Sequence, residues 1–241
     1  MNQTVSVNAS AFIDSVLRLR PQTAVFDCDG TLWSGDAGER FFSWELDRGV
    51  FSKERATALR ERYRQYKQGG VSEEQMCGEM VTLHAGMREA VVTGLAKEFF
   101  STTFVAQIFP EMRFLVERLE RSGCQIWACS STNLWVIEAA MEHFGVKRER
   151  ILAASVQIEN GVISDRLIRV PSGPGKPQAI REVLAANPDA AFGNSRWDQD
   201  MLEIARHAFA INPNADLEKV AAERGWTIYH PAMEGRETNQ N

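Results

Sequence analysis

Short β-forming runs alternate with amphipathic helical segments along most of this 241-residue chain, and this alternation limits the folds that it can adopt. Strands that are joined through helices lie parallel, in a sheet that the helices cover on both faces. The sequence therefore predicts an α/β fold with a mainly parallel sheet. The predicted strands are TAVFDCD (23–29), CQIWACS (124–130), DAAFGN (189–194), AFAI (208–211) and TIYH (227–230).

The helical patterns carry their own start and stop signals. Pro110 suits a first helical turn, and Gly123 and Gly145 suit C-terminal stops. Asn160-Gly161 lies between two alternating runs and is a strong signal for a β-hairpin. The predicted helices span residues 110–123, 134–145, 176–188, 200–207 and 216–225.

One block of the chain breaks this rhythm. Residues 36–106 are charged and helical in pattern, with no convincing strand, and they follow directly on the first predicted strand. We interpret the block as an inserted cap. The predicted division is a core of residues 1–35 and 107–241, with an all-helical cap at residues 36–106.

Composition narrows the possible functions. The formal net charge is −5, which gives no indication of a nucleic-acid or anionic-membrane partner. No run approaches the ~20 apolar residues of a membrane span. The first twenty residues lack the basic start and apolar stretch of a secretory signal. These features favour a cytoplasmic protein.

The cysteines and histidines do not indicate a zinc enzyme. The four cysteines form no C-x-x-C pair, and the four histidines have no metal-ligand spacing. Cys28 is better interpreted as a small apolar residue of its strand than as a nucleophile.

Polar side chains gather where the predicted strands end, which is where open parallel sheets bind ligands. The first strand ends in Asp27 and Asp29, and the second in Ser130-Ser131-Thr132. Lys176 begins a helix, and residues 193–200 (GNSRWDQD) close another strand. Carboxylate oxygens suit Mg²⁺, while a lysine and helix N-terminal amides suit phosphate. The sequence thus predicts a site for a phosphate and a metal.

In chain order, DCDGT (27–31), Ser130, Lys176 and GNSRWD (193–198) resemble the four motifs of the haloacid dehalogenase (HAD) superfamily. The helical block and the later hairpin resemble its phosphoserine-phosphatase-like branch, which has a helical cap of C1 type. The resemblance covers most of the chain. It implies a Rossmann-like core, and Mg²⁺-dependent hydrolysis of a small phosphorylated metabolite.

The resemblance also implies roles for individual residues. Asp27 attacks phosphorus and becomes an aspartyl phosphate, while Asp29 protonates the leaving oxygen and then activates water. Dehalogenases of the superfamily lack the second aspartate, so Asp29 favours a phosphatase. Phosphate contacts are expected from Thr31, Ser130, Ser131 and Lys176, and metal contacts from Asp27, Asp29, Asn194 and Asp198.

The fourth motif departs from the family pattern at Asn194, where the family has an aspartate that binds Mg²⁺. An amide oxygen still coordinates Mg²⁺, but without a full charge. We therefore expect weaker metal binding.

The sequence indicates the type of reaction more clearly than it indicates the substrate. Asp36 stands about where phosphoserine phosphatases keep an acid that meets the substrate amine, although an exposed acid without that role fits equally well. Trp33, Trp135 and Trp197 follow or lie within motifs, so they form either an aromatic wall for an apolar or ammonium leaving group, or packing between cap and core.

Several alternatives stay open at this point. Ser130 could be a helix N-terminal residue, Lys176 a solvated lysine, and Asp198 a helix N-cap as well as a metal-site residue. Asp200 fits a first-turn charge better than a ligand. The protein could also be a phosphotransferase or mutase of the same fold, or a non-catalytic phosphate-binding protein, for which Asn194 is the argument.

Overall fold

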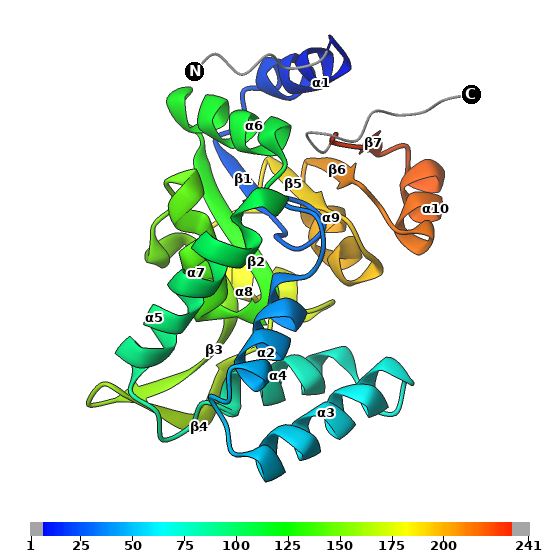
Figure 1. The fold of residues 1–241 in the computed structure, drawn as a ribbon. Coiled ribbons are helices and arrows are strands. Elements are labelled where there is room, and N and C mark those ends of the chain that lie inside the picture. Colours follow the sequence, from blue (N-terminus) through cyan, green and yellow to red (C-terminus); the bar gives the residue numbers. More distant parts are fainter. Residues whose placement is uncertain (1–6, 233–241) are drawn as a thin grey trace.

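A computed structural model describes residues 7–232 of the chain (Figure 1). Its centre is a seven-stranded sheet with the order β4-β3-β2-β1-β5-β6-β7. Neighbouring strands are parallel, except for the antiparallel pair β3–β4. The predicted mainly parallel sheet is therefore confirmed. The strands are β1 (Thr23–Phe26), β2 (Gln125–Asn133), β3 (Ile151–Glu159), β4 (Val162–Arg169), β5 (Ala190–Gly193), β6 (His207–Ile211) and β7 (Thr227–Tyr229).

Helices cover both faces of the sheet because successive strand residues point to opposite sides. Phe26 of β1 belongs to a hydrophobic cluster with α1, α6 and α7, whereas its neighbour Val25 packs with α8, α9 and α10. These helices are α1 (Val7–Arg18), α6 (Pro110–Arg121), α7 (Leu134–Met141), α8 (Gly175–Val183), α9 (Gln199–Ile204) and α10 (Ala215–Arg224). Short 3₁₀ turns lie at Glu142–Phe144, Arg148–Arg150 and Arg196–Asp198.

Helices α7, α8 and α9 end three or more residues earlier than the sequence predicts, and after α7 the 3₁₀ turn Glu142–Phe144 continues to Gly145. Helix α8 stops at Val183, because Leu184 takes extended backbone angles and packs against the Val25 cluster. Pro188 follows shortly after, and a residue before proline is disfavoured in a helix. Helix α9 stops at Ile204, and His207 pairs with Ala190 as the first residue of β6.

The segment 36–106 contains helices and, among the described residues, no strand beyond a single bridge at Arg88. Figure 1 shows α2, α3 and α4 together at the lower end of the molecule, far from α1. Helix α5 packs along α7 of the core. The elements of this helical insert are α2 (Ala37–Asp47), α3 (Lys53–Lys67), α4 (Glu73–Thr82), α5 (Glu89–Phe99), a π-helical turn (Phe100–Phe104) and a 3₁₀ turn (Val105–Gln107).

The predicted hairpin is present and anchors the insert. Asn160 and Gly161 both have positive φ, 53° and 77°, as the tight turn between β3 and β4 requires. The backbone of residues 86–89 hydrogen bonds to this hairpin through Gly86, Met87 and Glu89. The insert is therefore held to the edge of the sheet.

No helix in residues 7–232 is long and apolar enough to cross a membrane. The terminal residues 1–6 and 233–241 of the predicted core lie outside the described part.

Candidate active site

Asp27 lies directly after β1, at the carboxyl end of the sheet, and is 6% exposed. Its Oδ1 accepts a hydrogen bond from Lys176 Nζ at 2.6 Å, and its Oδ2 accepts one from Thr31 Oγ1 at 3.0 Å. Burial, and secondarily the carboxylate of Asp198, raises the pKa of Asp27 to about 7, against the lowering effect of Lys176. The carboxylate is thus fixed in orientation at the base of a cavity.

Lys176 is fully buried, so the alternative of a solvated lysine is wrong. Its ammonium donates to Asp27, to Asp198 Oδ1 at 2.5 Å and to the carbonyl of Cys129 at 2.9 Å. Burial alone would lower the pKa of Lys176, but the two carboxylates outweigh it and raise that pKa well above its ordinary value. Lys176 is a fixed cation beside Asp27.

Asp198 holds the loop after β5 and orients Lys176. Its Oδ2 accepts hydrogen bonds from the backbone N–H groups of Asn194 and Ser195, both at 2.9 Å. Asp198 is the N-cap residue of α9, as predicted, but its side chain makes no capping bond to that helix. The side chain instead closes a capping box on the short turn Arg196–Asp198, whose N-cap is Ser195.

Asp29 is enclosed by hydrogen-bond donors. Its Oδ1 accepts from Trp33 Nε1 at 2.7 Å and from the N–H of Ala37 at 2.6 Å, and its Oδ2 contacts Thr132 Oγ1 at 2.7 Å. Burial, followed by the charge of Asp36, raises the pKa of Asp29 to about 8 despite these donors. The raised pKa favours the protonated form of this carboxyl group, which can act as an acid.

The end of β2 shapes the next side of the site. The pairing of β2 with β3 shifts between Ser130 and Asn133, so residues 131 and 132 form a bulge. Asn133, and not Ser130, caps α7, with its side chain accepting from Val136 N–H. Ser130, Ser131 and Thr132 all line the cavity.

The cavity above Asp27 has a volume of about 540 Å³ and lies between the core and the helical insert. The core lines it with Asp27, Asp29, Gly30, Ser130, Ser131, Thr132, Asn133, Lys176, Asn194, Ser195, Trp197, Asp198 and Asn212. The insert and the turn leading into it line the other side with Gly35, Asp36, Gly38, Glu39, Tyr63, Tyr66, Lys67, Glu73, Met76, Cys77 and Met80.

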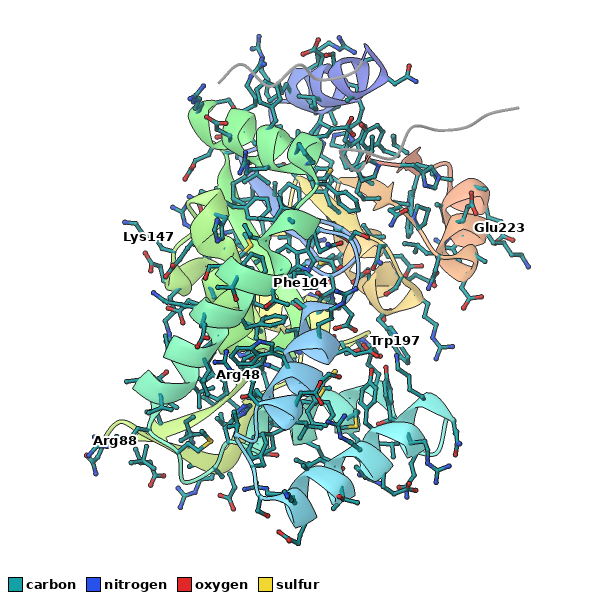
Figure 2. The ribbon with its side chains drawn as sticks, viewed as in Figure 1. Arg48, Arg88, Phe104, Lys147, Trp197 and Glu223 are labelled. Atoms are coloured by element: carbon teal, nitrogen blue, oxygen red, sulfur yellow. The ribbon has the colours of Figure 1, made fainter. Side chains whose placement is uncertain are left out.

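The three tryptophans have different surroundings. Trp197 lines the cavity, and Figure 2 shows it between the core and the helices of the insert. Trp33 is fully buried, with its ring against Phe100 and Phe104, and Trp135 is 2% exposed beside His84. Neither Trp33 nor Trp135 is among the residues that line the cavity.

Several cavity residues were not singled out from the sequence. Tyr63, Tyr66 and Lys67 come from α3, and Glu73 begins α4. The spacing of Tyr63, Tyr66 and Lys67 places them on one helical face, which is a usable signal in an otherwise charged helix. Which way that face points depends on how the insert packs.

The donors present suit a hard cation. Asp27 offers a carboxylate, Asp29 a backbone carbonyl and Asn194 an amide that takes part in no side-chain hydrogen bond within residues 7–232. The Asn194 side chain lies against Gly30, where a Cβ would come within 1.8 Å of it. Both oxygens of Asp198 are already bonded to protein groups. The oxygen donors therefore fit Mg²⁺, with fewer charges than a set of carboxylates.

Comparison with known proteins gives consistent results. The family model for haloacid dehalogenase-like hydrolases matches residues 24–203. A histidinol-phosphatase from Neisseria meningitidis is 24% identical over 216 residues, which are 85% of this chain and 96% of that protein.

Solved structures share the fold. A Bordetella pertussis protein of unknown function has a TM-score of 0.76 at 21% identity, over 86% of this chain and 97% of that one. A phospho-aspartyl intermediate analogue of phosphoserine phosphatase has a TM-score of 0.59 at 14% identity, over 88% of this chain and 94% of that one.

Proposed function

The chain belongs to the haloacid dehalogenase-like hydrolases and is a phosphatase of that family, and we propose that it hydrolyses a small phosphomonoester with Mg²⁺ through an aspartyl phosphate on Asp27. One observation carries the proposal. The Asp27 carboxylate faces the cavity while Lys176 and Thr31 fix both of its oxygens. A carboxylate held beside a buried cation is a competent nucleophile toward phosphorus.

The proposed reaction has two steps. In the first, a carboxylate oxygen of Asp27 bonds to phosphorus, and the bond from phosphorus to the alcohol oxygen breaks. Asp29, with its pKa raised to about 8, gives its proton to the departing alcohol oxygen. In the second, Asp29 takes a proton from water as the water oxygen attacks phosphorus and releases Asp27.

Other groups of the chain support both steps. Lys176 balances negative charge next to Asp27, and Ser130 and Ser131 line the cavity where they can contact phosphoryl oxygens. Mg²⁺, held by Asp27, the Asp29 carbonyl and Asn194, would neutralise the phosphoryl group. Asp198 acts through Lys176 and the loop it orders.

We also propose a role for each part of the chain. Residues 1–35 and 107–241 form the catalytic core, and residues 36–106 form the helical cap that meets the alcohol. The cavity between them supports this division, since it has catalytic aspartates on one side and insert residues on the other.

The test is turnover of p-nitrophenyl phosphate with Mg²⁺, with and without EDTA. In the wild type we expect Mg²⁺-dependent activity and trapping of beryllium fluoride at Asp27. Asp27→Asn should abolish both. Asp165→Asn, an exposed change on β4 outside the cavity, is the matched control. Substantial Mg²⁺-dependent turnover by Asp27→Asn would refute the covalent mechanism.

A further inference from the structure

The insert side of the cavity is rich in carboxylates. Asp36, Glu39 and Glu73 line it, and Lys67 is the one cation there among the described residues. Lys67 Nζ lies 3.0 Å from Glu39 Oε2, so this pair is neutral as a unit. Asp36 and Glu73 form no ion pair within residues 7–232, although the charge of Lys67 also acts on Asp36.

The core side, in the part of the chain that the structure describes, supplies no free cation either. Lys176 is the one basic residue of the described core that lines the cavity, and it lies between Asp27 and Asp198. Arg196 is close by, with its guanidinium 4.2 Å from the centre of the Trp197 ring, but it does not line the cavity. The part of a substrate that extends beyond its phosphate group therefore contacts a cavity wall of net negative charge.

Two hydrogen bonds orient the Glu73 carboxylate in this region. Its Oε2 accepts a hydrogen bond from the hydroxyl of Tyr66 at 2.8 Å, and its Oε1 accepts one from Ser131 at 3.3 Å. Neutral donors orient the carboxylate but leave its charge in place. Glu73 thus faces the cavity from the first turn of α4, directly across from the predicted phosphate contacts at the end of β2.

Aromatic rings reinforce the attraction for cations. The rings of Tyr63 and Tyr66 are 5.6 Å apart, and both line the cavity. Lys67 Nζ lies 5.2 Å from the Tyr63 ring and 5.9 Å from the Tyr66 ring, so both rings already take part in cation–π contacts. Met76 and Met80 make the adjoining wall apolar.

We propose that this phosphatase selects phosphomonoesters whose alcohol carries a positively charged nitrogen and no carboxylate, with Glu73 as the residue that sets the selectivity. The proposal rests on the phosphatase function given above. An ammonium group on the substrate alcohol is attracted by the Glu73 carboxylate and by the rings of Tyr63 and Tyr66. A carboxylate at the same place is repelled by Glu73 and Asp36.

Three probes that differ by one group each test it: ethyl phosphate, O-phosphoethanolamine and O-phospho-L-serine. Adding the amine to ethyl phosphate should raise kcat/KM. Adding the carboxylate to O-phosphoethanolamine should lower kcat/KM about tenfold, the effect of one partly screened charge contact.

Glu73→Gln keeps the shape of the side chain and removes its charge. It should reduce the preference for O-phosphoethanolamine over O-phospho-L-serine by about five- to tenfold, mainly through KM. Glu74→Gln is the matched control, because Glu74 is the next residue of α4, is exposed and does not line the cavity. The preference of Glu74→Gln for O-phosphoethanolamine over O-phospho-L-serine should stay within about twofold of that of the wild type.

The outcomes separate the two proposals. Equal or better hydrolysis of O-phospho-L-serine, or a preference that Glu73→Gln leaves unchanged, would overturn the selectivity while turnover of p-nitrophenyl phosphate still upheld the phosphatase. Absence of turnover with every ester, p-nitrophenyl phosphate included, would refute the proposed phosphatase function and this inference with it.

Discussion

At the scale of single residues, the two aspartates of the first motif differ in what surrounds them. Asp27 has a buried ammonium group at 2.6 Å, while Asp29 has only neutral donors and the charge of Asp36 nearby. The pKa of Asp27 is raised to about 7 and that of Asp29 to about 8. The ammonium group of Lys176 favours the charged form of Asp27, and no cation within residues 7–232 acts in this way on Asp29, so Asp27 suits the attack and Asp29 suits proton transfer.

The charge of Asp36 gives a pH prediction. Because that charge raises the pKa of Asp29, Asp36→Asn should lower it, and the alkaline limb of kcat for O-phosphoethanolamine should move to lower pH. Asparagine still caps α2, where Asp36 accepts from Glu39 N–H at 2.7 Å. A pH–rate profile checks this, with Asp165→Asn as control. An unmoved alkaline limb would show that Asp29 does not titrate in that limb.

Asn194 gives a metal prediction. Asn194→Asp adds a charge beside Asp27 and Asp29, so the apparent Mg²⁺ affinity should rise about tenfold while kcat need not increase. Asn212→Asp is the control, since it adds the same charge to the cavity wall outside the motif. Mg²⁺ titrations of activity measure both. Equal affinities for wild type and Asn194→Asp would remove Asn194 from the metal site.

At the scale of elements, the hairpin between β3 and β4 connects the sheet to the insert. Its turn depends on positive φ at Gly161, and its strand β4 hydrogen bonds to residues 86–89. A defect in this turn would therefore affect both the sheet edge and the anchoring of the insert.

Two glycines in open space test the turn. No atom lies within 4 Å of a Cβ built at Gly161 or at Gly94, but only Gly161 has positive φ. Gly161→Ala should destabilise the protein by about 1–2 kcal/mol. Gly94→Ala, in the exposed interior of α5, should stabilise it by about 0.5–1 kcal/mol. Thermal or urea unfolding measures both. If both substitutions changed the free energy of unfolding in the same direction, the positive φ of Gly161 would not be the deciding factor.

At the scale of the whole molecule, the helices of the insert are held to different degrees. Helix α5 buries Val92, Ala96 and Phe99 and packs on α7 of the core. Helix α3 has no buried residue and packs mainly on α4. Since α3 carries Tyr63, Tyr66 and Lys67, the least buried helix of the insert forms part of the cavity wall.

This difference predicts the dynamics of the insert. Amides of α3 should exchange with deuterium at least about tenfold faster than those of α5, because local opening exposes little apolar surface there. Orthovanadate bound in the cavity should slow exchange in α3 and leave α5 nearly unchanged. Hydrogen-exchange mass spectrometry makes the comparison. Equal protection of the two helices would mean that the insert opens as one unit.

The sequence by itself determined the alternation of strands and helices, the hairpin at Asn160-Gly161 and the order of the four motifs. These features are local: periodicity assigns the elements, and turn residues fix the connections. Parallel strands end at the same edge of a sheet, so the pattern of strands alone predicts that Asp27, Ser130 and Asn194 lie near one another.

Only the tertiary structure decided where individual side chains point. Asp198 bonds to Lys176 and to its own loop, and Trp33 and Trp135 are buried while Trp197 reaches the cavity. Glu73 accepts a hydrogen bond from Ser131, which lies far from it in the chain, and another from Tyr66. Such contacts depend on how helices rotate and pack against a shared core, and no local pattern of residues encodes that rotation.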